Sequence, residues 1–141
     1  MKKNIIPLLI FMCCWSVNAY LYAQEKSSSN LDLLQNKNWV MWFPSEKEYT
    51  YTQKFSSDTC FSIFSYNGEN IEIKEKYCFS NTPDVDISPS KREKLKIGKY
   101  IIMENQGEIK AYEILKLTSD SLILKNLDNL WILTYISSDK K

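Results

Sequence analysis

Histidine is absent from this chain of 141 residues. Imidazole is the commonest general base and the commonest metal ligand in proteins, so its absence excludes a Ser-His-Asp triad and any zinc site built with histidine. We find no other set of residues that combines a nucleophile, a base and a group that orients the base. The sequence therefore predicts a protein that is not an enzyme and that uses neither a cofactor nor a metal.

A large excess of charge of one sign is missing as well. The 18 basic residues are balanced by 17 acidic ones, and the net charge is +1. A general electrostatic affinity for nucleic acid or for an acidic membrane needs a strongly basic surface, so we expect no nucleic acid among the partners. With 44% hydrophobic and 25% charged residues, the composition is that of an ordinary globular domain.

The chain begins with an apolar run that is too short to span a membrane. The run extends from Ile5 to Val17, whereas a spanning helix needs about 20 residues. Lysines precede it and small residues follow it, which is the layout of a secretory signal peptide. We predict cleavage after Ala23, with Ala19 as the alternative, and export to the periplasm or the cell surface without a membrane span.

A lipid-anchored form is the less favoured alternative. It would use Cys13 or Cys14 as the acylated residue, but the small residues that usually precede such a cysteine are missing. We therefore divide the chain into a signal peptide at 1–23, a flexible polar tether at 24–29 and one domain at 30–141.

Cys60 and Cys78 are the two cysteines that remain after cleavage. An even pair in an exported protein is a disulfide candidate. A bond between neighbouring strands requires both side chains on one face of the sheet. A five-residue turn between the two strands would provide this arrangement and a four-residue turn would not. Two buried thiols are the alternative.

Apolar residues recur with a period of two along the domain, which is typical of β-strands. A flat antiparallel sheet of this size would expose two edges, so closure into a barrel is expected. We predict an all-β fold, an eight-stranded antiparallel up-and-down meander that closes into a lipocalin-like barrel with a short N-terminal helix. The predicted strands are Trp39–Phe43, Tyr49–Phe55, Thr59–Tyr66, Ile71–Phe79, Lys99–Glu104, Glu108–Thr118, Ser121–Asn126 and Leu130–Ile136.

The turns between the last four strands predict a pairing register. A three-residue turn that ends at Gly107 places Ile101 opposite Ala111 and Lys99 opposite Glu113. The later turns extend the same face to the end of the chain. The residues predicted to line the barrel are Ile101, Met103, Ile109, Ala111, Leu115, Leu117, Leu122, Leu124, Trp131, Leu133 and Tyr135.

A short helix is predicted before the first strand. Asp32 and Gln35 have the spacing of a capping box, and the helix would end at about Asn36. Such a helix is too short to be stable alone and must dock on the barrel. The last strand also has apolar residues on its outer face, so we expect the helix to cover that face, which carries Leu130, Ile132 and Ile136.

The segment from Ser80 to Leu95 is the one long connection between predicted strands, and it carries Pro83 and Pro89. Long connections in compact domains are usually functional or disordered. The basic residues at 91–96 are interpreted as solvated surface, because no aromatic residues are interleaved with them. The acidic residues at 84–86 are interpreted in the same way, because the rest of a calcium-binding loop does not follow them.

These features resemble the lipocalin-like, calycin-type proteins that Gram-negative bacteria secrete into the periplasm or tether to the outer membrane. The resemblance rests on the leader, on a short helix that runs into Leu34–Trp39 at the first strand, and on the stretch from Tyr112 to Leu124. It covers nearly the whole mature chain. It implies a small barrel that binds a ligand or another protein, usually without catalysis.

Our main hypothesis is an exported, non-enzymatic protein that holds a small, mostly apolar ligand in its barrel. Lys99 and Glu113 would sit at the rim, either as a structural salt bridge or as a pair that orients a polar group of the ligand. The alternative is a protein-interaction module, such as an inhibitor, an immunity-type protein or an envelope assembly factor, which uses the outer surface and the segment 80–95. The candidate ligand contacts are Lys99, Met103, Glu113, Trp131 and Tyr135.

Overall fold

The fold was obtained as a computed structural model that describes residues 29–43 and 48–139. The predicted signal peptide and the predicted tether, apart from Ser29, lie outside the described residues. Among the helices of the described part, none is long and apolar enough to cross a membrane.

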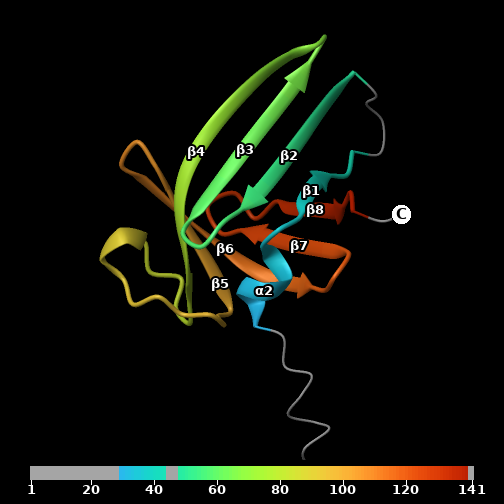
Figure 1. The fold of residues 1–141 in the computed structure, drawn as a ribbon. Coiled ribbons are helices and arrows are strands. Elements are labelled where there is room, and N and C mark those ends of the chain that lie inside the picture. Colours follow the sequence, from blue (N-terminus) through green and yellow to red (C-terminus); the bar gives the residue numbers. More distant parts are fainter. Residues whose placement is uncertain (1–28, 44–47, 140–141) are drawn as a thin grey trace, which may run out of the picture.

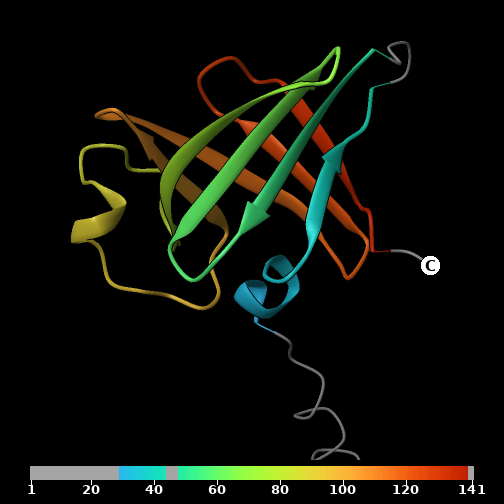
Figure 2. The same cartoon turned by 45° about the horizontal axis from the view of Figure 1, so that its top comes forward.

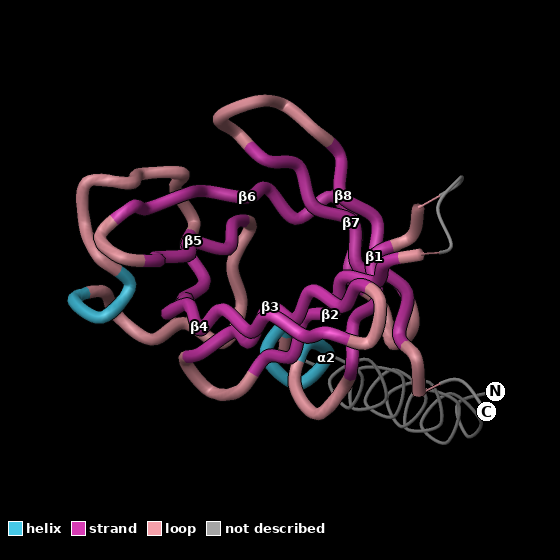
Figure 3. Tube along the Cα trace, turned by 90° about the horizontal axis from the view of Figure 1, so that it is seen from above, coloured by secondary structure: helices cyan, strands magenta, loops and turns pink. Residues whose placement is uncertain are grey.

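Eight antiparallel strands form a closed barrel, in which each strand pairs with the next along the chain and β8 pairs with β1 (Figures 1 and 3). Closure leaves no open sheet edge. The predicted fold class is confirmed. The strands are β1 (Asn38–Met41), β2 (Tyr49–Phe55), β3 (Thr59–Tyr66), β4 (Glu69–Ser80), β5 (Tyr100–Asn105), β6 (Glu108–Leu117), β7 (Ser121–Asn126) and β8 (Ile132–Ser137).

The helix α2 (Asn30–Leu34) lies at one end of the barrel (Figure 2). Leu34 is fully buried there in the same cluster as Trp39, whose indole Nε1 donates a hydrogen bond of 2.9 Å to the Leu34 carbonyl oxygen. The helix therefore closes this end of the barrel. The expectation that it covers the outer face of β8 was wrong, since Ile132 and Ile136 remain exposed.

The cap of α2 is one turn earlier than predicted. Ser29 is the N-cap, and its hydroxyl oxygen accepts a hydrogen bond from the backbone N–H of Asp32. The Asp32 carboxylate accepts in return from the Ser29 side chain and backbone, and these bonds lower the pKa of Asp32. Asp32 is thus the third residue of the helix instead of its cap, and Gln35 follows the last turn.

The pairing of β5 with β6 differs by one residue from the predicted register. Asn105 pairs with Glu108 across the two-residue turn 106–107, where φ is 50° and then 85°. Positive φ at both positions is the geometry of a type I′ turn, the form that suits the twist of a hairpin. A one-residue slip moves every side chain of a strand to the other face. Ile109 and Ala111 therefore point outward, and their predicted place in the barrel lining was wrong.

A β-bulge in β6 corrects a second predicted pairing. Ile114, instead of Leu115, lies opposite Leu124, and the register shifts before Lys116. The extra residue turns Leu115 outward, where it is exposed. The other pairs predicted for the last three strands are confirmed, namely Leu117 with Leu122, Leu122 with Tyr135 and Leu124 with Leu133.

Of the two alternatives for the cysteine pair, the structure has the buried thiols, since Cys60 and Cys78 are both free and buried. The turn between β3 and β4 contains only the two residues 67–68, so Tyr66 pairs directly with Glu69. This turn is shorter than both of the turns considered above. It places Cys60 on the inner face and Cys78 on the outer face, and side chains on opposite faces cannot be bridged.

We expect both thiols to react slowly in the folded protein. Burial, with a smaller contribution from the negative charge of Glu75, raises the pKa of Cys60 from 9.0 to about 12. Because the thiolate is the reactive form, this lowers the reactive fraction of Cys60 about 10³-fold near pH 8. Burial also raises the pKa of Cys78. Alkylation without reductant, followed by peptide mapping, should show Cys60 protected until the protein is unfolded. A cross-linked Cys60–Cys78 peptide would contradict this arrangement.

The long connection between β4 and β5 covers part of the outer face of the barrel (Figure 1). It contains the short 3-10 helix η1 (Pro89–Lys91), and the Ser88 hydroxyl donates a hydrogen bond to the Glu104 carboxylate of β5. A second apolar cluster lies on the outer face of the barrel wall, and it is formed by Cys78, Ile102 and Ala111 with Tyr100, Ile109 and Leu127 packed against them. This cluster explains why β5 carries apolar residues on both faces.

Candidate ligand site in the barrel

The closed end of the barrel is filled by apolar side chains. Strand alternation turns every second residue inward, and these residues pack with Leu34 of α2 in the main core. Phe55 and Tyr77 lie edge to face, with ring centroids 5.2 Å apart. The fully or nearly fully buried members of this core are Leu34, Trp39, Phe55, Cys60, Tyr77, Phe79, Ile101, Met103, Leu122, Leu124 and Tyr135.

A chain of polar groups crosses the interior above this core. The Gln53 amide Nε2 donates to the Ser62 hydroxyl oxygen at 3.3 Å. Ser62 Oγ donates in turn to Glu75 Oε2 at 2.9 Å. These residues lie on β2, β3 and β4, and Gln53 is only 4% exposed. Buried polar groups in proteins are almost always hydrogen-bonded, so a buried polar atom without a partner is unusual.

The chemistry of these three side chains determines which of them donates and which accepts in each hydrogen bond. A carboxylate such as that of Glu75 only accepts hydrogen bonds, so the Ser62 hydroxyl must donate its single hydrogen to Glu75. The Ser62 oxygen can then only accept from Gln53, which places the amide NH₂ of Gln53 toward Ser62. The Gln53 carbonyl oxygen Oε1 points elsewhere, and it is the one buried side-chain oxygen or nitrogen without a hydrogen-bond partner in the described part of the chain.

Tyrosine side chains surround this chain of polar groups. Burial raises the pKa of Tyr51, Tyr112 and Tyr135, and the negative charge of Glu75 contributes to each rise. The rings of Tyr51 and Tyr135 are 6.4 Å apart between centroids. We call the whole set the interior polar cluster, and it consists of Tyr51, Gln53, Ser62, Glu75, Tyr112 and Tyr135.

The opposite end of the barrel is a mouth with an apolar wall on one side. The strands β2, β3 and β4 extend together on this side (Figure 1). Phe64 is on the same face of β3 as the buried Ser62, and Ile73 is on the same face of β4 as Tyr77, yet they are 37% and 42% exposed. Inward-facing apolar side chains that stay exposed show that this end is open. We call these residues the mouth wall: Phe64, Tyr66, Ile71 and Ile73.

Aromatic rings extend the mouth wall toward β1. Tyr49 lies 5.7 Å from Phe64 and 5.8 Å from Phe43 between ring centroids. Aromatic pairs at these distances attract one another beyond the area that they bury. The rings therefore form a continuous apolar surface that leads from the rim toward the interior polar cluster.

The structure separates the predicted ligand contacts. Met103 and Tyr135 are buried on the inner face, where Met103 belongs to the filled core and Tyr135 to the interior polar cluster. Trp131 is 69% exposed beside the turn between β7 and β8. The prediction that Trp131 lines the barrel was wrong, because Trp131 precedes β8 and its side chain is exposed.

Lys99 and Glu113 form the predicted ion pair, at 3.3 Å between Lys99 Nζ and Glu113 Oε1. The pair lies outside the barrel. Glu113 pairs with Tyr100 in the observed register, and these two residues point outward because their neighbours Tyr112 and Ile101 point inward. Lys99 is 61% exposed, and the carboxylate of Glu113 raises its pKa. The predicted position of these two residues on the inner face was wrong, and an exposed pair of this kind contributes little to stability.

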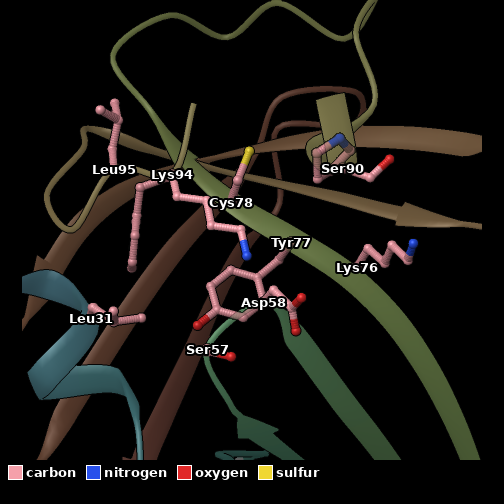
Figure 4. A pocket seen from close by; sticks show the side chains of 11 residues that line it. Leu31, Ser57, Asp58, Lys76, Tyr77, Cys78, Ser90, Lys94 and Leu95 are labelled. Atoms are coloured by element: carbon pink, nitrogen blue, oxygen red, sulfur yellow. The ribbon is translucent and has the colours of Figure 1, made fainter. Parts of the chain in front are cut away.

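A separate pocket lies between α2, β4 and the connection 81–99 (Figure 4). Its lining includes Leu31, Tyr77 and Lys94, and its volume is about 130 Å³. Sites for drug-sized ligands usually have about 300 to 1,000 Å³. This pocket can hold a few waters or a very small molecule, so it is a weaker candidate than the mouth.

Neither the mouth nor this pocket has the ligands of a metal site. Within residues 29–43 and 48–139 no group of three or more histidine, cysteine, aspartate or glutamate side chains could hold a metal ion. The mouth instead combines an apolar wall with a few polar groups, features that are typical of sites for small molecules.

Sequence reasoning missed the polar members of the site. Gln53, Ser62 and Glu75 each stand at an inward position between apolar neighbours, for example between Ile73 and Tyr77. A polar residue that interrupts an inward apolar series is the signal that could have found them, once the alternation of each strand was known.

Comparison of the chain with protein-family models, with curated proteins and with solved structures gave no match.

Proposed function

We propose that this chain is an exported, non-enzymatic binding protein that holds a small, mostly apolar ligand in the mouth of its barrel. The observation that carries the proposal is the mouth wall, since it exposes apolar side chains on the inner face of a closed barrel. Exposed apolar patches commonly mark binding sites. The eight-stranded architecture with a helix at the closed end agrees with the resemblance to secreted bacterial lipocalin-like proteins, and the leader supports export.

The mouth wall can be tested with a neutral apolar fluorescent probe, N-phenyl-1-naphthylamine. We expect the mature protein to bind the probe and to enhance its fluorescence. Phe64→Ser and Ile73→Ser should each weaken binding about tenfold, because each removes about 1.5 kcal/mol or more of apolar contact with the probe. Fluorescence titration gives the dissociation constants.

Ile132→Ser is the matched control. It also replaces an exposed apolar residue of a strand by serine, but on the outer face of β8. The control should bind the probe as the parent does. The proposal fails if the parent does not bind the probe, or if the control loses as much affinity as the two mouth variants.

A second candidate function is protein interaction through the outer surface. Its support is the exposed pair Leu130 and Trp131 beside the β7–β8 turn, since exposed tryptophan is typical of protein interfaces. Deleting the segment 80–95 would also remove η1, which contacts β4 and β5, and would not be a clean test. A pull-down from envelope extract with the parent and with Trp131→Ser separates this function from ligand binding.

A further inference from the structure

The interior polar cluster contains two hydrogen-bond acceptors that can take a further donor, Gln53 Oε1 and the Glu75 carboxylate. Gln53 Oε1 is buried and has no partner in the described part of the chain. A buried acceptor without a donor is energetically unfavourable. Such acceptors are rare in native proteins, and an external partner or a functional role often explains them. A ligand that brings a donor would satisfy this oxygen.

Glu75 adds a negative charge that forms no salt bridge with a basic side chain of residues 29–43 and 48–139. The two ion pairs of the described residues join Lys99 to Glu113 and Lys110 to Glu108, and neither includes Glu75. Its carboxylate accepts one hydrogen bond from Ser62 and is only partly buried. Carboxylate oxygens have room for several donors, so Glu75 retains acceptor capacity.

The surroundings of Glu75 favour a cation over an anion. Glu75 raises the pKa of Tyr51, Tyr112 and Tyr135, which places its charge close to these rings. Tyrosine rings attract cations through their faces, and a carboxylate attracts them by charge. Lys110, an inward-facing base nearer the rim, is already paired with Glu108 at 3.2 Å. An anionic ligand would face Glu75 without a compensating base beside it.

We propose, on the basis of the function proposed above, that the buried end of the ligand is a protonated amine, held by Glu75 and by Gln53 Oε1, while its apolar body lies against the mouth wall. An ammonium group carries three donors and a positive charge and has no acceptor of its own. It therefore matches a site that offers an unpaired carbonyl oxygen, an unneutralised carboxylate and aromatic rings.

Three ligands with the same apolar chain test this proposal, namely decylamine, decanol and decanoate. Each is titrated, below the concentration at which it aggregates, against the parent loaded with N-phenyl-1-naphthylamine. We expect decylamine to displace the probe at the lowest concentration, at least tenfold below decanol, and decanoate to be the weakest.

Glu75→Gln should remove the advantage of the amine. This variant keeps the shape of the side chain and loses its charge, so decylamine should weaken about tenfold while decanol changes little. Glu72→Gln is the matched control, because it makes the same change on β4 at an exposed position of the outer face. Gln53→Met removes the unpaired oxygen at similar volume and should also weaken decylamine, which keeps the test valid if Glu75→Gln folds poorly.

The outcomes distinguish this inference from the proposed function. If the three ligands displace the probe equally, or decanoate displaces it best, the amine is the wrong class although the mouth still binds apolar molecules. If Glu75→Gln and Gln53→Met bind decylamine as Glu72→Gln does, the interior polar cluster does not hold the amine. If the parent binds neither the probe nor decylamine, both the proposed function and this inference fail.

Discussion

Replacing Trp39 by alanine is expected to lower the free energy of unfolding by about 3 to 5 kcal/mol. Trp39 is fully buried on the inner face of β1, at the end of the barrel that α2 closes. Its removal leaves a cavity among core residues that cannot all collapse into the space. It also deprives the Leu34 carbonyl oxygen of the indole N–H that lies 2.9 Å away. Urea denaturation of parent and variant, monitored by far-UV circular dichroism, measures the difference in the free energy of unfolding.

Trp39→Phe separates packing from the hydrogen bond. Phenylalanine keeps most of the apolar volume but cannot donate, so we expect a smaller loss, of about 1 to 3 kcal/mol. Trp131→Phe makes the same chemical change at an exposed position, where surface substitutions usually stay within about 0.5 kcal/mol. If Trp39→Phe is as stable as the parent, the bond between Trp39 and Leu34 does not hold the closed end together.

Replacing Gly98 by alanine is expected to lower the free energy of unfolding by about 1 to 3 kcal/mol through overpacking. A Cβ atom at this position would lie 2.8 Å from the backbone N and O of Ser80 and 2.9 Å from Phe79 Cβ. These neighbours belong to the end of β4 and cannot move as a flexible side chain can. The segment 96–98 would therefore have to shift away from the barrel.

The shift should also loosen α2. The Asn30 side chain donates to the Gly98 carbonyl oxygen at 2.7 Å, and the Leu31 backbone N–H donates to the Lys96 carbonyl oxygen at 3.1 Å. Hydrogen exchange should show faster exchange at Leu31 in Gly98→Ala. Gly68→Ala is the comparison, since its Cβ would meet nothing within 4 Å and only its φ of 82° is strained. Equal protection of Leu31 in both variants would refute the link between Gly98 and the helix.

The inward face of β5 and its pairing with β6 could not be predicted from the local sequence pattern. The sequence Tyr100-Ile101-Ile102-Met103 is apolar at successive positions, so alternation does not identify the inner face. Ile102 is apolar because it packs with Cys78 and Ala111 in an apolar cluster on the outer face of the barrel. A turn of two or three residues fits the sequence before Glu108 equally well, and only the closed ladder selects the two-residue form.

The number, order and approximate bounds of the strands could be predicted from the sequence, because period-two alternation and turn residues are local signals. Closure could be predicted as well, since eight strands in sequence would otherwise expose two edges. Which face each residue takes depends on turn length and on bulges, and a one-residue change reverses it. The strand pairing of the folded barrel was therefore needed to show that Cys60 and Cys78 lie on opposite faces and that Lys99 and Glu113 lie outside. Folding also brings Gln53, Ser62 and Glu75, from three different strands, into one series of hydrogen bonds inside the barrel, which no local pattern could show.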